Sequence, residues 1–347
     1  MNYTAKTLSI IIMMLLLMIN NYAIGSDTIT IALTGDIMMG TTYPEIALPA
    51  DTGKHLYKDV TPYLLNADLT FGNLEGTLCN AGKSTKKAGK YSYAFRTPTT
   101  FAPRLAEAGY AYLSMANNHA NDFGTEGIIS TEQCLDEQGI AYSGIAGRRE
   151  WAVVERRGIR FGICAFGHNS YTLKHNDLQK VKQILDTLKS MSDIVIVSFH
   201  GGAEGKDYSH LPQGKETFLG EDRGSLRQFA HFCIDNGADV VYGHGPHIVR
   251  CIEVYQNRFI AYSLGNFCTP YGVNLTGISG YAPVVSIKID NTGRFINGDI
   301  HSFIQIRGAG PRTDNANAVA KQMKSLSEVD VPNSQAKIDS IGHITYK

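Results

Sequence analysis

The chain has 347 residues, 43% of them hydrophobic, and its 32 Lys and Arg residues balance its 32 Asp and Glu residues. This length allows one large α/β domain or two ordinary ones, with ample apolar side chains for a core. A formal net charge of zero argues against a nucleic-acid partner, because phosphate binding needs clustered Lys and Arg side chains. The dense basic run at residues 83–90 lies among Gly, Ser and Thr and is interpreted as a solvated loop, with a polyanion contact as the alternative.

Residues 1–25 have the pattern of a signal peptide. Lys6 precedes an uncharged apolar stretch at residues 8–19, and the small residues Ala23 and Gly25 follow it. This stretch is shorter than the about 20 residues that cross a membrane, but it suits the apolar region of a signal peptide. We expect the mature chain to begin near Ser26 in an exported compartment, periplasmic or at the cell surface. An uncleaved N-terminal membrane anchor is the alternative.

Short apolar runs alternate with helical patterns in the rest of the chain. The run at residues 193–199 is almost continuously apolar, which is typical of a strand with both faces buried. After residue 283 apolar and polar residues alternate, which predicts antiparallel strands at residues 284–289 and 300–306. Further strands are predicted at residues 28–33, 68–71, 110–115, 160–166, 238–242 and 259–264, and helices at residues 100–108, 127–138, 178–191 and 226–236.

This order of elements predicts an α/β fold with one mixed sheet or two packed sheets. No repeat and no Pro-rich linker divides the chain, so residues 26–310 are predicted to form one domain. Beyond residue 310 the composition becomes polar, and residues 311–347 are predicted to be a peripheral helix and tail. The six cysteines show neither a CxxC pair nor a zinc-ligand spacing. Export would permit disulfides, but several of the cysteines lie in apolar runs, where buried free thiols are expected.

Polar side chains that can bind metal ions directly follow the predicted strands. The carboxyl ends of strands in an open α/β sheet face the ligand crevice, so residues far apart in the sequence converge there. Each has a simpler explanation when taken alone, since Asp36 could cap a helix and Asn118 could form an Asx-turn. Their recurrence at six strand ends favours one shared site. The six groups are Gly35-Asp36, Asn73-Leu74-Glu75, Asn117-Asn118-His119, His200 with Glu204, His244 with His247, and Asn266.

These groups combine carboxylate, amide and imidazole side chains. Imidazole suits zinc and iron, whereas carboxylate and amide oxygens suit manganese or magnesium. The mixed set predicts one or two divalent ions, with Mn, Fe or Zn expected. Such a centre would polarise a phosphoryl or acyl oxygen and generate hydroxide at neutral pH.

In chain order these motifs resemble the series of the CapA family, the bacterial poly-γ-glutamate capsule synthesis proteins. The resemblance covers about residues 28–270, and Asn117-Asn118-His119-Ala120 and Ser263-Leu264-Gly265-Asn266-Phe267 are its most specific parts. It implies the calcineurin-like metallophosphatase architecture, a four-layer sandwich of two mixed β-sheets flanked by helices. It also implies a role in making or exporting a poly-γ-glutamate capsule.

The sequence departs from the motifs of active metallophosphatases at several positions. Met38 stands where the first motif has a histidine, and Asn73 stands where the second has an aspartate. One extra residue separates His244 from His247 in the last motif. A centre with weaker or single-metal binding is therefore one alternative, and a centre that has lost hydrolysis is another.

The resemblance and the strand-end pattern together suggest three sets of site residues. His119 is predicted to be the general acid or the group that stabilises developing charge, oriented by Asp122. Arg96 could hold an anionic group bidentately or, alternatively, lie on the surface. The predicted metal ligands are Asp36, Glu75, Asn118, His200, His244 and His247, and the predicted substrate-binding residues are Arg96, Asn117, Glu204 and Asn266.

Two functions are compatible with these residues, and the concentration of His and carboxylates at strand ends counts against a third, a structural role without any ligand. The first is an exported, metal-dependent hydrolase that acts on a phosphoester or on an amide of a γ-glutamyl polymer. The second is a non-catalytic subunit of a capsule synthesis or export complex at the membrane, which binds the anionic polymer in the same crevice. Metal analysis and a phosphodiesterase assay would distinguish them, because metal-free protein that still binds polyglutamate would favour the second.

Overall fold

The computed structural model describes residues 28–87, 89 and 92–347. The predicted signal peptide at residues 1–25 lies outside these residues. Within the described part of the chain, no helix combines the length and the apolar character that a membrane span requires.

The first of two large sheets contains nine strands around β1. β1, β2, β5 and β6 run parallel, and β15 adds to β1 in the same direction. On the other side of β1 the strands β16, β17, β21 and β20 are antiparallel. The strands are β1 (Thr28–Ile37), β2 (Leu69–Leu74), β5 (Tyr112–Ser114), β6 (Ala141–Ser143), β15 (Asn266–Cys268), β16 (Val284–Asp290), β17 (Phe295–His301), β20 (Ala336–Ile338) and β21 (His343–Tyr346).

The second sheet contains six strands, in the order β13-β14-β12-β9-β8-β7. Its four central strands are parallel, and an antiparallel strand closes each edge. The strands are β7 (Trp151–Arg156), β8 (Ile159–Phe166), β9 (Ile194–His200), β12 (Val240–His244), β13 (Ile252–Tyr255) and β14 (Arg258–Ala261).

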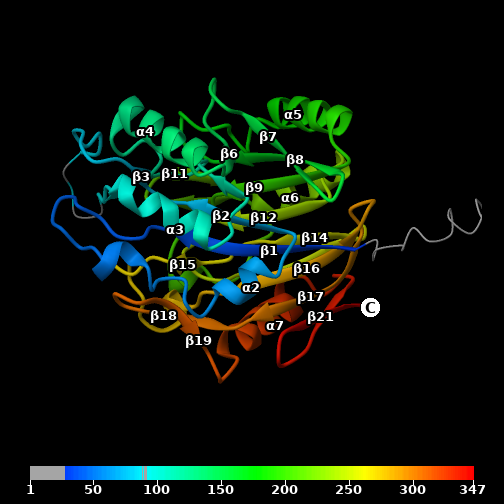
Figure 1. Ribbon diagram of the computed structural model, residues 1–347. Helices are drawn as coiled ribbons and strands as arrows, with labels where there is room; N and C mark the ends of the chain where they lie inside the picture. The colour runs from blue at the N-terminus through cyan, green and yellow to red at the C-terminus, as the bar shows by residue number, and fades with distance from the viewer. Residues whose placement is uncertain (1–27, 88, 90–91) are drawn as a thin grey trace, which may run out of the picture.

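The two sheets pack face to face, and helices cover their outer faces (Figure 1). In β9, Ile194 and Ile196 belong to the core between the sheets, whereas Val195 and Val197 pack outward against helices. This period-two alternation explains the continuous apolar run, because both faces of the strand are covered. The first sheet carries α2 (Thr61–Leu65), α3 (Ala102–Glu107) and α4 (Gly124–Glu137), and the second carries α5 (Leu178–Met191) and α6 (Leu226–Asp235).

This arrangement confirms the predicted α/β class and the four-layer sandwich of two mixed sheets. The predicted strands and helices are present with shifted ends, and the helix at residues 178–191 is α5. The strand predicted at residues 300–306 is divided between β17 and β18 (Phe303–Ile306), because the chain leaves the first sheet at Ser302 and β18 pairs with β19 (Gly310–Thr313). All six cysteines are buried free thiols, as expected.

Residues 311–347 form more than the predicted peripheral helix and tail. The helix is α7 (Ala318–Asp330), and the chain then returns to the first sheet as β20 and β21. Ile338 and Ile344 are buried in the core between the sheets together with Met323 of α7. The polar composition obscured these strands, because both of them alternate buried and exposed side chains.

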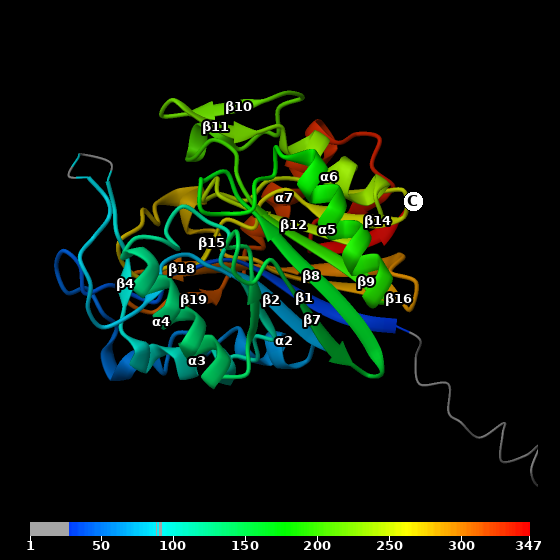
Figure 2. The same cartoon turned by 90° about the horizontal axis from the view of Figure 1, so that it is seen from above.

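Several short elements complete the fold. The β10–β11 hairpin stands out from the sheets beside α6 (Figure 2). The other elements are β3 (Thr77–Leu78), β4 (Arg96–Thr97), β10 (Glu216–Phe218), β11 (Glu221–Gly224) and the 3₁₀ turns Ala50–Gly53, Thr99–Phe101, Lys206–Tyr208 and Gly277–Gly280.

Candidate metal centre

The ends of parallel strands from both sheets meet at one edge of the sandwich. In the first sheet Asp36 lies in register with Asn73 of β2 and with Asn266 of β15. In the second sheet His200 of β9 is in register with His244 of β12. The approach of these strands needs glycine, since a Cβ atom at Gly35 would lie 2.0 Å from the carbonyl oxygen of Gly265.

Asp36 is fully buried at the centre of this edge and has polar neighbours on both oxygens. Its Oδ1 accepts a hydrogen bond of 2.9 Å from Asn73 Nδ2 and lies 3.2 Å from His244 Nδ1. Its Oδ2 lies 3.1 Å from His247 Nδ1, which donates instead to Asn266 Oδ1 at 3.0 Å. The carboxylate of Asp36 therefore joins the histidines of the second sheet to the first sheet.

Glu75 approaches the same point from the turn that follows β2. Its Oε1 lies 3.6 Å from His247 Nε2 and 3.9 Å from His119 Nε2. One ligand atom each of Asp36, Glu75 and His200 falls within 4.8 Å of the others, a spacing that a single ion can bridge.

Six potential ligand atoms of this cluster are buried and have no hydrogen bond within the part of the chain that the structure describes. They are Asp36 Oδ2, Glu75 Oε1 and both ring nitrogens of His200 and of His244. Burying an unpaired polar atom costs about 1–3 kcal/mol, so four such side chains at one point need a partner in common. A divalent cation satisfies carboxylate oxygens and imidazole nitrogens together, and the residues present therefore fit one.

The pKa values of the cluster follow from its burial and from the opposite charges that lie close together in it. Burial raises the pKa of Glu75 well above its usual range, and the nearby charge of Asp36 adds to this effect. Burial also acts to raise the pKa of Asp36, but His244 and His247 outweigh it and hold that pKa well below its usual value. Burial opposes protonation of His247, yet the carboxylates of Glu75 and Asp36 raise its pKa to about 10.

His119 lies beside this cluster in a fixed orientation. Its Nδ1 is 2.9 Å from Asp122 Oδ2, while its Nε2 faces Glu75. Burial lowers the pKa of His119 although Asp122 acts in the opposite direction. Lys86 closes this side, with Nζ 3.4 Å from Asp122 Oδ1 and donating to the Asn118 carbonyl at 2.8 Å.

Comparison with known protein families identifies the family of this chain. The family described as bacterial capsule synthesis protein PGA_cap matches residues 30–271, well over half of the chain. The chain belongs to the PGA_cap family.

Two PGA_cap relatives carry the CapA name. A capsule biosynthesis protein CapA from Bacillus anthracis is 29% identical over 266 residues, which cover 71% of this chain and 61% of the relative. A PGA biosynthesis protein CapA from Bacillus subtilis is 29% identical over 284 residues, which cover 78% of this chain and 70% of the relative. The chain thus spans less than two thirds of the length of the Bacillus anthracis protein.

A solved structure described as a novel phosphatase from Mycoplasma pneumoniae shares the fold. It has a TM-score of 0.52 and 15% identity, and the match covers 80% of this chain and 94% of that structure. The metallophosphatase-like fold that the CapA resemblance implied is therefore confirmed.

The other predicted site residues of this PGA_cap chain lie around the cluster or apart from it. Asn118 has a buried Oδ1 without a hydrogen bond. Glu204 forms an ion pair of 2.7 Å with Arg223. The Arg96 guanidinium donates to the carbonyls of Thr42 and Gly82, so the structure ties this side chain to neighbouring loops.

Two of the predicted substrate-binding residues belong to the frame of the site instead. Asn117 is fully buried, and its Nδ2 donates to Asn73 Oδ1 and to the Leu74 carbonyl. Asn266 is also fully buried, and its Nδ2 donates to the carbonyls of His247 and Ser279. Their amide donors are thus used within the protein, and substrate contact by these two residues stays a prediction.

Sequence reasoning missed two buried side chains close to the cluster. His168 follows β8 after a glycine, the same pattern that identified the other groups, and its Nδ1 lies 3.4 Å from the His200 carbonyl. Arg223 is buried in β11 between Glu204 and Glu221. The strand-end pattern could have found His168, but no local signal pointed to Arg223.

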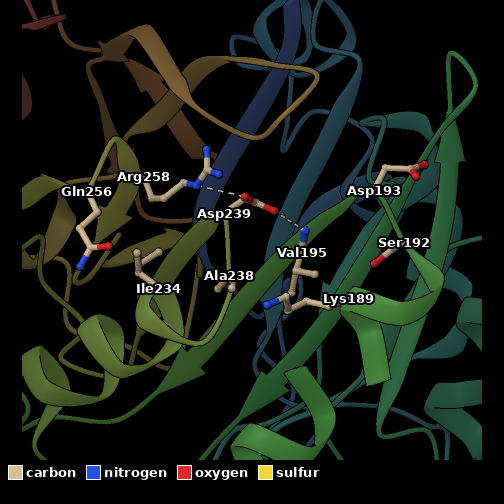
Figure 3. Close-up of a pocket in the computed structure, with 10 residues that line it drawn as sticks. Lys189, Ser192, Asp193, Val195, Ile234, Ala238, Asp239, Gln256 and Arg258 are labelled. Carbon is tan, nitrogen blue, oxygen red and sulfur yellow. Dashed lines mark hydrogen bonds and ion pairs between the residues drawn. The ribbon is translucent and has the colours of Figure 1, made fainter. Parts of the chain in front are cut away.

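A cavity of about 410 Å³ lies at the opposite end of the second sheet, where β9 and β12 begin (Figure 3). Its buried carboxylate, Asp239, accepts from the Val195 amide at 2.8 Å and pairs with Arg258 at 3.1 Å. Both of its oxygens are therefore satisfied by the protein. The candidate metal centre, in contrast, combines convergent side chains with unsatisfied atoms.

Proposed function

We propose that this protein is an exported, CapA-like protein of poly-γ-glutamate capsule synthesis that carries a metal-dependent hydrolase centre. Family membership and the CapA relatives support the capsule role. A similar protein from Mycobacterium tuberculosis, described as a probable polyglutamine synthesis accessory protein, supports an accessory role beside the polymer-making machinery. The signal-peptide pattern of residues 1–25 supports export.

The unsatisfied ligand atoms of Asp36, Glu75, His200 and His244 carry the proposal of a metal centre. These residues would hold the ion together with Asn118 and His247, and the mixed oxygen and nitrogen donors favour Mn, Fe or Zn. When bound, the ion supplies Lewis-acid polarisation of a phosphoryl or acyl oxygen and lowers the pKa of a water molecule.

His119 supplies the proton transfer in this proposal. Asp122 accepts the Nδ1 hydrogen and fixes the tautomer, so Nε2 faces the cluster as the atom that exchanges a proton with substrate. Because burial lowers the pKa of His119, the neutral ring predominates at neutral pH, and Nε2 would first accept a proton from the attacking water molecule. The same atom can then return it to the leaving group.

The proposed substrate is a phosphoester or a γ-glutamyl amide within an anionic polymer. Lys86 lies at the His119 side of the cluster, and Lys83 and Lys87 are exposed in the same loop. These side chains can attract carboxylates of a polymer toward the centre.

This basic loop also favours the second candidate, a subunit that binds the anionic polymer without cleaving it. The deciding experiment measures the metal content of purified protein by mass spectrometry. It then follows hydrolysis of a phosphodiester and of γ-glutamyl oligomers, with His244→Ala as the comparison. Stoichiometric metal and metal-dependent turnover support the hydrolase, whereas metal-free protein that binds polyglutamate supports the binding subunit.

Export is tested separately by the intact mass of protein recovered from the exported fraction. A mass that begins near Ser26 supports cleavage of the signal peptide. A mass that retains residues 1–25 supports the N-terminal anchor instead.

A further inference from the structure

A chain of buried carboxamides connects the turn that carries His119 to Asp36. The His119 amide N–H donates to Asn117 Oδ1 at 3.0 Å, and Asn117 Nδ2 donates to Asn73 Oδ1 at 3.0 Å. Asn73 Nδ2 then donates to Asp36 Oδ1 at 2.9 Å. Asn73, Asn117 and Asp36 are all fully buried, so solvent does not compete for these hydrogen bonds.

The direction of every bond in this chain is determined. Asn117 uses both Nδ2 hydrogens, one on Asn73 Oδ1 and one on the Leu74 carbonyl. The atom of Asn73 that faces Asn117 must therefore be an acceptor, and its amide nitrogen must face Asp36. An aspartate in place of Asn73 would bring two carboxylates to this short distance without a shared donor.

A carboxylate that binds a metal ion must be held against rotation. One oxygen of Asp36 is fixed by Asn73, which leaves Oδ2 buried, without a hydrogen bond, and 3.1 Å from His247 Nδ1 of the cluster. Partners that hydrogen-bond to ligating carboxylates typically set metal affinity, and their loss costs about 10- to 100-fold.

We infer that Asn73 is a positioning residue that aims Asp36 Oδ2 at the metal, and that Asn117 holds Asn73 in the orientation this requires. The inference rests on the proposed metal centre. It assigns Asn73 a role through Asp36, without contact with the ion, and it couples the position of Asp36 to the turn that carries His119.

The test compares the affinity for Mn²⁺ or Zn²⁺, measured by isothermal titration calorimetry on purified protein. Asn73→Ala should weaken binding by about 10- to 100-fold, and Asn117→Ala should weaken it less, because the Asn73 donor remains.

Thr34→Val is the matched control. Thr34 lies two residues from Asp36 on the same strand and hydrogen-bonds to Tyr110. This change therefore removes a buried hydrogen bond that does not belong to the chain of carboxamides. It should lower stability without changing metal affinity.

Unchanged affinity in Asn73→Ala, with the parent protein binding metal, overturns the inference and leaves the proposed centre intact. If Asn73→Ala does not fold, Asn73→Ser, which keeps a small polar side chain, provides the same comparison.

A second measurement needs no metal. In the metal-free parent the side-chain amide hydrogens of Asn73 should exchange slowly, and Asn117→Ala should accelerate this exchange. If the parent binds no metal, the proposed metal centre is wrong. Fast exchange of the Asn73 amide hydrogens in the parent would overturn the chain of carboxamide hydrogen bonds itself.

Discussion

His119 and Asp122 form a buried pair in which the imidazole Nδ1 lies 2.9 Å from the carboxylate Oδ2. The same oxygen accepts the Phe95 amide at 2.7 Å, which fixes the carboxylate in place. Asp122 thus orients His119 through Nδ1, and Nε2 lies 3.9 Å from Glu75 Oε1.

This geometry predicts that His119→Ala lowers turnover by about 10²- to 10⁴-fold while the protein keeps its metal. The measurement is kcat beside metal content on the same preparation. His210→Ala is the matched control, because His210 pairs with Asp330 at 2.8 Å but is exposed and apart from the cluster. A His119→Ala protein that turns over at the parent rate, or that lacks metal, contradicts the assigned role.

His244→Ala should lose both metal and activity, since it removes a fully buried ring beside Asp36 whose two nitrogens have no hydrogen bond among the described residues. Added Mn²⁺ should stabilise the parent by about 2.7 kcal/mol at one hundred times its dissociation constant, and this thermal shift should disappear in the variant. The exposed His343→Ala serves as the control. Retention of a full thermal shift in His244→Ala would remove His244 from the ligand set.

Stability should fall on acidification because of His175. Burial, reinforced by the nearby His168, lowers the pKa of His175 to about 4. Between pH 6.5 and about pH 4, His175 is protonated in the unfolded chain but remains neutral in the folded chain. The free energy of unfolding therefore decreases as pH falls through this window. One such group contributes a slope of about 1.4 kcal/mol per pH unit at most.

The uncharged variant His175→Gln should reduce this slope, as measured by urea unfolding at intervals from pH 7.5 to pH 4. Above pH 7 the slopes of the parent and the variant should agree, because neither the folded nor the unfolded state then protonates the imidazole. Equal slopes at all pH values would show that His175 does not control acid stability.

Arg250 should be important for stability through a buried ion pair. Its guanidinium is fully buried and holds both oxygens of Glu216 at 2.9 and 2.7 Å, which fastens the β10–β11 hairpin to the loop after His247. Arg250→Met leaves Glu216 buried and unpaired, so we expect a loss of about 3–5 kcal/mol in the free energy of unfolding.

The control for this prediction is Arg160→Met, which breaks an exposed ion pair with Asp193 of similar geometry. Water and salt screen that pair, so its loss should change stability far less. Comparable losses in the two variants would show that burial does not distinguish the two pairs.

The sequence predicted the elements of the fold well where hydrophobic periodicity was strong. The apolar run that became β9 and the amphipathic pattern of α5 are local properties of the chain, and local sterics and burial determine them. The division between β17 and β18 could not be predicted, because Ser302 marks the point where the chain leaves one sheet for another pairing. The return of β20 and β21 to the first sheet depended on partners far away in the sequence.

The convergence of Asp36, Glu75, His200, His244 and His247 followed from the sequence, because parallel strands place their carboxyl ends at one edge. Which polar side chains face the centre was decided by the tertiary structure alone. Asn117 and Asn266 lie at strand ends like the predicted ligands. In the packed structure, however, their side-chain amides donate to neighbouring protein atoms. A hydrogen-bond direction depends on groups brought together by packing, and a one-dimensional pattern carries no information about them.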